Sequence, residues 1–302
     1  LNEMASQLPT SFTLNNGSIM PAVGFGTFRI RDNELIYKVV DSALDAGYRL
    51  FDTAAVYRNE MHLKNAFHSL LPKYGLERKD IFVTTKISPD DHGGTEKVEY
   101  ACQKSLNNLG LDYVDLYLIH FPGTAKYTSD DPINKQYRDK TWAGLEKLYK
   151  SGRAKAIGVS NFTVRHLKEL MNSKYITHTF VPSVNQVEWH PYYYQQDLLD
   201  FCKENNIQLQ AYCSFGGTSS ADNSLLRDAT VTGIAKKLGV STAQLLLVWA
   251  LQQGVAVIPK STNPQRIKEN IALDFTIPEG DLKALNSLQK NKKYAWDPTV
   301  VE

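Results

Sequence analysis

Four side chains with acid–base chemistry stand where short apolar segments of the sequence end. They are Asp52, Tyr57, Lys86 and His120, and they follow three consecutive apolar segments. A phenol has a pKa of about 10 and is a poor acid at neutral pH. A nearby ammonium favours the phenolate and lowers that pKa, and a carboxylate can hold the ammonium in place. With a histidine to orient a carbonyl oxygen, this set suits the protonation of an oxygen that gains negative charge.

Each of these side chains also has an ordinary structural explanation. A tyrosine or a histidine at the end of a strand often only packs in the core, and Asp52 with Lys86 could be a plain buried ion pair. The functional interpretation therefore depends on the convergence of all four at one place. The secondary-structure elements that carry them must produce that convergence.

Short apolar, β-branched segments alternate with helical patterns along the chain, and they predict buried strands. We expect eight strands, near 22–26, 50–53, 81–85, 114–119, 154–159, 183–187, 208–212 and 256–259. One helix between them has a single apolar face, formed by Leu63, Ala66, Phe67, Leu70 and Leu71. Another, at 243–251, is apolar on nearly all sides and should be deeply packed, with Ser241 and Gln244 as a capping box at its start.

Eight strand–helix repeats favour an α/β fold of the closed (β/α)8 TIM-barrel type. A doubly wound open sheet shows the same alternation but usually has fewer strands. The C-terminal strand ends of a barrel converge, so the four side chains would meet there. Apolar residues alternate around Asn-Asn-Gly in segment 11–20, which predicts a β-hairpin that closes the bottom of the barrel. We predict one domain over 1–302, with the residues before Met4 foreign to the natural chain.

Composition excludes several classes of partner. The 302 residues are 42% hydrophobic and 22% charged, with a net charge of +2 and no dense Lys/Arg stripe or polybasic tail. Cys102, Cys202 and Cys213 form neither a disulfide framework nor a zinc pattern, which indicates a reducing compartment. No segment is long and apolar enough to span a bilayer, and no secretory signal is recognisable. We expect a cytoplasmic monomer without nucleic-acid or membrane partners.

A candidate anion site follows the eighth predicted strand. Asn263 and Pro264 fit the N-cap and first position of a helix. Lys260 and Ser261 precede this cap, and Arg266 falls in the first turn. Cations and free N–H groups at a helix N-terminus bind anions, although a solvated charged face explains the same residues equally well. No G-x-G-x-x-G fingerprint for a dinucleotide is present.

Four segments of the sequence resemble the motifs of the aldo-keto reductase family. They are 47–57 (GYRLFDTAAVY), 111–120 (LDYVDLYLIH), 156–162 (AIGVSNF) and 258–267 (IPKSTNPQRI), in the order found in that family. The resemblance extends from about Gly17 to Asp297. It implies a reductase that converts small aldehydes or ketones to alcohols with NADPH, with Asp52, Tyr57, Lys86 and His120 as the catalytic tetrad. The resemblance also implies that Tyr57 is the general acid.

The same resemblance implies the residues that contact NADPH or NADP⁺. Lys260, Ser261 and Arg266 would bind the 2′-phosphate, with Glu269 and Asn270 near the adenine. Ser160, Asn161 and Gln186 would bind the nicotinamide carboxamide, and Tyr212 would stack on its ring. Thr27 and Asp52 would lie on the ribose side, and Ser214 and Phe215 on the pyrophosphate side.

The expected substrate pocket departs from the family pattern. Phe28, Ser88 and Phe121 stand where the family usually has tryptophan, and the loops after His120 and Tyr212 are short. Aromatic residues of the pocket would be Phe28, Tyr57 and Phe121, with His120 and the tail residue Trp296. These departures do not touch the tetrad, but they make substrate inference from better-known relatives unsafe.

Two other functions remain open from the sequence. The chain could be a non-catalytic NADP(H)-binding subunit, like the channel-associated relatives of this family, and turnover of a generic aldehyde would exclude that. It could also be a barrel hydrolase that uses metal-bound water. No His/Asp/Glu cluster at metal-ligand spacing supports the hydrolase, and insensitivity to a chelator would exclude it.

Overall fold

A parallel eight-stranded sheet forms the centre of the computed structural model, which describes residues 7–173, 181–217 and 221–302. Its strands pair in chain order and are β3 (Phe25–Gly26), β4 (Leu50–Asp52), β5 (Phe82–Ile87), β6 (Val114–Ile119), β7 (Ala154–Ser160), β8 (Val184–Glu188), β9 (Gln208–Tyr212) and β10 (Ala256–Val257). The N–H groups of Gly24 and Gly26 donate to the carbonyls of Val257 and Pro259 at 2.8 and 3.0 Å. These bonds join β3 to β10 and close the barrel.

The predicted strands agree with the structure, with two exceptions at the seam. β6 and β9 have the predicted bounds, whereas β3 and β10 are shorter than 22–26 and 256–259. Around β3 only an isolated bridge from Val23 to Val257 extends the pairing. β10 ends before Pro259, which has no N–H to continue the ladder.

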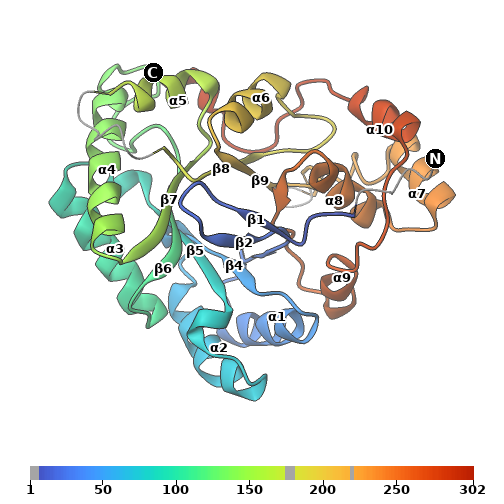
Figure 1. Ribbon diagram of the computed structural model, residues 1–302, viewed down its shortest axis with the longest axis horizontal. Helices are drawn as coiled ribbons and strands as arrows, with labels where there is room; N and C mark the ends of the chain where they lie inside the picture. The colour runs from blue at the N-terminus through green and yellow to red at the C-terminus, as the bar shows by residue number, and fades with distance from the viewer. Residues whose placement is uncertain (1–6, 174–180, 218–220) are drawn as a thin grey trace.

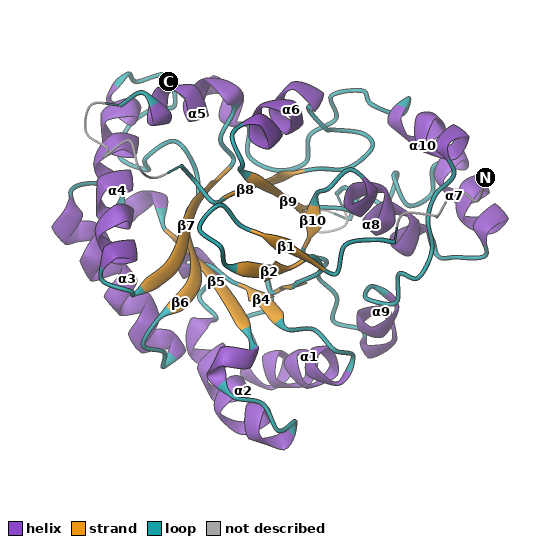
Figure 2. Ribbon diagram, in the orientation of Figure 1, coloured by secondary structure: helices purple, strands orange, loops and turns teal. Residues whose placement is uncertain are grey.

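Helices surround the barrel in an outer layer (Figures 1 and 2). They are α1 (Asn33–Asp45), α2 (Glu60–Lys73), α3 (Thr95–Leu109), α4 (Ile133–Lys150), α5 (Val164–Met171), α6 (Gln196–Glu204), α7 (Ala229–Leu238), α8 (Thr242–Gln252), α9 (Pro264–Glu269) and α10 (Glu279–Asn286). The predicted apolar face of α2 is buried, and so is every residue of α8 from Leu245 to Leu251. Both bonds of the capping box between Ser241 and Gln244 are present.

The N-terminal hairpin closes one end of the barrel. It consists of β1 (Ser11–Thr13) and β2 (Ile19–Pro21), and it lies across the barrel in Figure 2. The Asn16 amide donates to the carbonyl of Lys155 at 2.7 Å, close to the start of β7. Leu14 and Met20 pack with the apolar side chains that fill the barrel interior. Because the hairpin covers the N-terminal strand ends, as predicted, the C-terminal ends are left for chemistry.

Two further features bear on the sequence-based expectations. Among the described residues no single helix is long and apolar enough to cross a membrane, although the bent pair α7 and α8 meets that criterion jointly. Cys102, Cys202 and Cys213 are free thiols. The expectation for the residues before Met4 lies outside the described residues.

Candidate active site

A buried ion pair at the C-terminal ends of β4 and β5 forms the centre of the site. The Lys86 ammonium lies 2.7 Å from Oδ1 of Asp52 and donates to the carbonyl of Thr53 at 2.9 Å. It also lies 3.3 Å from the hydroxyl of Tyr57. Lys86 and Asp52 are almost completely buried. Burial lowers the pKa of Lys86, and the carboxylate of Asp52 opposes that shift.

His120 completes the group that the sequence predicted. It follows β6, and its ring lies 5.7 Å from the ring of Tyr57, centroid to centroid. Burial lowers the pKa of His120 well below its ordinary value, and the charge of Lys86 lowers it further. The imidazole is therefore neutral. Its Nδ1 is buried without a hydrogen-bond partner.

The direction predicted for the Tyr57 pKa is wrong. The sequence predicted that the neighbouring ammonium would lower this pKa. In the structure burial raises the pKa of Tyr57 well above its ordinary value, and the carboxylate of Asp52 raises it further. Transfer of a phenolate out of water is unfavourable, and burial is the largest cause of the shift. Tyr57 is half-buried, and its raised pKa keeps the hydroxyl protonated at neutral pH.

The loop that presents Tyr57 is fixed by a buried asparagine. Tyr57 ends a short 3-10 helix, η1 (Ala55–Tyr57), directly after β4. The amide of Asn59 donates to the carbonyls of Thr27 and Ile30, at 3.0 and 2.9 Å, and accepts from the hydroxyl of Thr53. These bonds tie the loop after β3 to the loop after β4. No sequence motif indicates Asn59, because its role depends on contacts between two loops.

A second unforeseen link runs across the barrel interior. Nε2 of Gln186, on β8, donates to Oδ2 of Asp52 at 2.8 Å and to Oε1 of Gln210 at 2.8 Å. Both glutamines are buried. Gln186 was expected at the nicotinamide; in the structure its amide holds the carboxylate that binds Lys86.

Three residues expected at the nicotinamide are hydrogen-bonded around the ends of β7 and β9. The amide of Asn161 donates to the carbonyl of His120 at 3.0 Å and to Oγ of Ser160 at 3.1 Å. The hydroxyl of Tyr212 donates to Oδ1 of Asn161. Asn161 has a left-handed backbone with a φ of 65°, which asparagine tolerates better than most residues. The same network therefore reaches the tetrad through the backbone of His120.

Thr27 and Ser214 also lie at strand ends. The hydroxyl of Thr27 donates to the carbonyl of Asp52 at 2.8 Å. Ser214 follows β9, and its buried Oγ has no hydrogen-bond partner. Phe215 is half-buried and packs against the main core.

The candidate anion site lies at the start of α9. Asn263 caps the helix and Pro264 is its first residue, as predicted. Lys260 is half-buried, and burial followed by the charge of Arg29 lowers its pKa. Arg266 is exposed. The other expected residues here are Ser261, which binds the N–H of Asn263, Glu269 on the helix and the buried Asn270 at its end.

Aromatic side chains line one side of the tetrad. The ring of Phe28 lies 5.1 Å from that of Tyr57. The indole of Trp296 lies 5.5 Å from the ring of His120 and 5.4 Å from that of Phe121. Ser88 instead exchanges hydrogen bonds with Asp90 and caps the short helix that follows β5.

The described part of the chain contains no set of side chains suited to binding a metal ion. Within 7–173, 181–217 and 221–302, no group of three or more His, Cys, Asp or Glu side chains is arranged to hold a metal ion.

Comparisons with known proteins agree with this geometry. The profile of the Aldo/keto reductase family matches residues 22–290. An aldehyde reductase of Saccharomyces cerevisiae is 40% identical over 92% of this chain and 90% of its own length. The glycerol 2-dehydrogenase (NADP(+)) of the same yeast is 38% identical over 93% and 91%. The crystal structure of MGS-M4, an aldo-keto reductase from a deep-sea metagenome library, has a TM-score of 0.83 at 41% identity and covers 94% of this chain and 96% of its own.

One conclusion follows from a family profile over most of the chain, relatives that are matched over most of their length and a shared barrel. The chain belongs to the aldo/keto reductase family.

Proposed function

We propose that this protein reduces aldehydes and ketones to alcohols with NADPH, and that Tyr57 is the general acid. The observation that carries the proposal is the position of the Lys86 ammonium. It lies 2.7 Å from Asp52 and 3.3 Å from the Tyr57 hydroxyl, at the strand ends where barrel enzymes do their chemistry.

The tetrad can supply a proton and then stabilise the charge left behind. Because its pKa is raised, Tyr57 carries its proton at neutral pH. As the carbonyl oxygen of a substrate gains negative charge, the phenol O–H transfers its proton to that oxygen. The phenolate that remains faces the ammonium of Lys86, which Asp52 holds in place.

His120 fits the role of an orienting group. Its pKa is lowered by burial, so it does not compete with Tyr57 as an acid at neutral pH. A neutral imidazole next to the phenol can hydrogen-bond the same substrate oxygen. His120 therefore positions the oxygen for the proton from Tyr57.

The residues around the tetrad fit a phosphorylated dinucleotide. The unpartnered hydroxyl of Ser214 and the amide and hydroxyl groups of Asn161 and Tyr212 offer polar contacts near the strand ends. Lys260 and Arg266 offer the cations that a 2′-phosphate requires. When bound, NADPH supplies the hydride that reduces the carbonyl carbon. The two yeast relatives are a glycerol 2-dehydrogenase (NADP(+)) and an aldehyde reductase, which supports both choices.

NADPH oxidation against a panel of aldehydes, quinones, ketosteroids and sugars tests the proposal. We expect turnover of at least one aldehyde, unchanged by a chelator. Tight NADPH binding without turnover of any carbonyl would favour the non-catalytic subunit and contradict the proposal. Activity lost on chelation would favour a metal-dependent enzyme instead.

A further inference from the structure

The tail of the chain, residues 293–302, crosses the site between two sets of anchoring contacts. It begins at β8 and ends beside α5, where Figure 1 places the C-terminus. Trp296 lies between the two anchors and faces His120 and Phe121. This arrangement raises the question of what fixes the position of its indole.

The first anchor is the buried carboxylate of Glu188 at the end of β8. Its Oε2 accepts from the Lys293 ammonium at 2.7 Å and from the N–H of Ala295 at 2.9 Å. Its Oε1 accepts from the N–H of Tyr294 at 2.7 Å and from the ring of His190 at 2.9 Å. Burial raises the pKa of Glu188, but the His190 hydrogen bond and the charge of Lys293 outweigh it and bring the pKa to about 2. Glu188 thus stays ionised and binds three consecutive tail residues.

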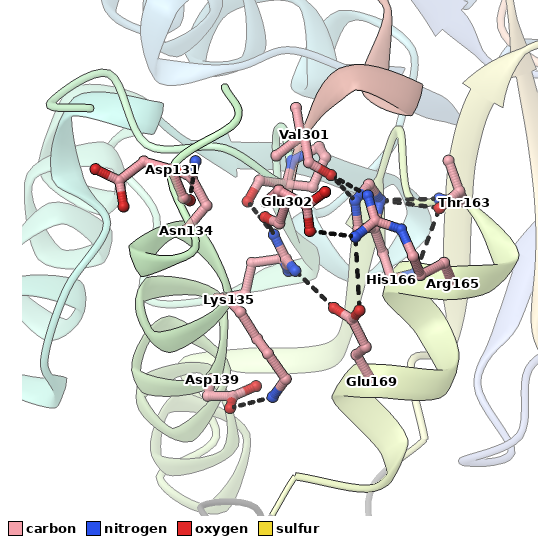
Figure 3. Close-up of polar contacts among 12 residues, drawn as sticks. Asp131, Asn134, Lys135, Asp139, Thr163, Arg165, His166, Glu169, Val301 and Glu302 are labelled. Carbon is pink, nitrogen blue, oxygen red and sulfur yellow. Dashed lines mark hydrogen bonds and ion pairs between the residues drawn. The ribbon is translucent and has the colours of Figure 1, made fainter. Parts of the chain in front are cut away.

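The second anchor joins the end of the tail to α4 and α5 (Figure 3). Arg165 donates to the carbonyl of Val301 and lies 3.1 Å from the carboxylate of Glu302. His166 contacts the same carbonyl of Val301 at 2.9 Å. The buried Arg138, on α4, donates to the carbonyl of Glu302.

Trp296 has little burial of its own to hold it. Its exposed fraction is 53%, whereas Val301 at the second anchor is fully buried. A half-exposed indole gains only part of the free energy of full burial, and a mobile backbone would let it move away. The backbone N–H groups just before Trp296 are fixed by Glu188, so the position of the indole depends on that carboxylate.

We propose that Glu188 is a positioning residue for substrate selectivity, which holds Trp296 as a wall of the carbonyl pocket, with Arg165 as the second anchor. This inference rests on the proposed reductase function. A wall that is fixed beside His120 and Phe121 favours substrates with a flat aromatic or apolar group on the carbonyl carbon. A two- or three-carbon aldehyde does not reach the wall and should not depend on it.

Tryptophan fluorescence tests the positioning without any turnover. The chain has four tryptophans, and Trp142, Trp189 and Trp249 are at most 1% exposed. Quenching by acrylamide therefore reports mainly on Trp296. Glu188→Gln replaces one acceptor oxygen with an N–H₂ group that faces donors, so the quenching constant should rise. An unchanged quenching constant in a folded Glu188→Gln protein would overturn the proposal.

A kinetic cycle tests whether Glu188 acts through Trp296. In Glu188→Gln, KM for nitrobenzaldehyde should rise about tenfold, as for the loss of one hydrogen bond to a charged group. The kcat for propanal should stay unchanged. In a protein that already carries Trp296→Ala, Glu188→Gln should not raise KM for nitrobenzaldehyde any further. Additive effects of the two substitutions, or an equal loss with propanal, would show that Glu188 does not work through Trp296.

Arg165→Gln provides a second variant if Glu188→Gln does not fold, because the Arg165 side chain is 41% exposed. Like Glu188→Gln, it should raise both the quenching constant and KM for nitrobenzaldehyde. Lys237→Gln is the matched control, since it removes an ion pair with Asp281 on the surface that involves no residue of the tail. A wild-type protein that reduces no carbonyl would refute the proposed function, yet the quenching comparison would still decide the role of Glu188.

Discussion

Gln186 donates a hydrogen bond of 2.8 Å to Oδ2 of Asp52, the carboxylate whose other oxygen binds Lys86. Both oxygens of this buried carboxylate are therefore engaged, one by β8 and one by β5. The ammonium that faces Tyr57 is thus fixed from across the barrel as well as from the neighbouring strand.

Gln186→Leu should weaken both stability and turnover. It leaves Oδ2 of Asp52 buried without a donor, and a hydrogen bond to a charged group contributes about 1.5–3 kcal/mol. We expect urea unfolding to show a loss of that order, together with a lower kcat. Gln210→Leu is the matched control, because it removes the hydrogen bond between Gln186 and Gln210 and leaves the bond from Gln186 to Asp52. Equal effects of the two substitutions would place the importance of Gln186 elsewhere than in Asp52.

The sequence located the tetrad because strand ends can be read from local patterns. β6 and β9 have the predicted bounds, and the residue after β6 is His120. The contact between Gln186 and Asp52 could not be read, because it joins β8 to β4 across the interior. Which inward-pointing side chains meet there depends on the tilt and stagger of the strands.

Electrostatics were predicted less well than positions. The charges near Tyr57 were identified from the sequence, but the extent of its burial was not, and burial decides the direction of its pKa shift. Glu188 was missed for a related reason. A carboxylate that binds three residues over a hundred positions later leaves no local signal.

Cofactor choice should depend on Arg266. A charge-assisted contact to a 2′-phosphate is worth about 1.5–3 kcal/mol, which corresponds to roughly a ten- to hundredfold preference for NADPH. Arg266→Met should weaken NADPH binding by that factor in a fluorescence titration and leave NADH almost unchanged. Lys268→Met, an exposed cation on the same helix, is the control. Equal losses for the two cofactors would show that Arg266 has a structural role only.

Stability should fall in acid partly because of His92. Its ring is fully buried with neither nitrogen hydrogen-bonded, and burial lowers its pKa from 6.5 to about 3. The unfolded chain then binds one more proton than the folded chain between these pH values. The free energy of unfolding should decrease by about 1.4 kcal/mol per pH unit from this group as the pH falls. Above about pH 6.5 the imidazole is neutral in both the folded and the unfolded chain, so this group causes no loss of stability there.

Urea titrations at several pH values check this. His92→Leu should give a shallower decline between pH 6 and 4, because the group that takes up the proton on unfolding is gone. The exposed His68, changed to leucine, serves as control. A His92→Leu protein with the wild-type decline would show that another group causes the acid sensitivity.

Substrate preference should follow the aromatic wall. Phe28, Phe121 and Trp296 line the tetrad, so aromatic or medium-chain aldehydes should be preferred to free sugars. The comparison is kcat/KM for nitrobenzaldehyde against kcat/KM for xylose and glucose. A higher value for either sugar would refute the apolar pocket.

The most direct measurement for the proposed chemistry is the single-turnover rate of NADPH oxidation by Tyr57→Phe. This substitution removes one hydroxyl and keeps the ring, so NADPH affinity should barely change. General acid catalysis typically contributes about 10²- to 10⁴-fold, and the rate with an aldehyde should fall by at least that order. A folded Tyr57→Phe protein that binds NADPH and reduces the aldehyde at the wild-type rate would contradict the role of Tyr57 as the proton donor.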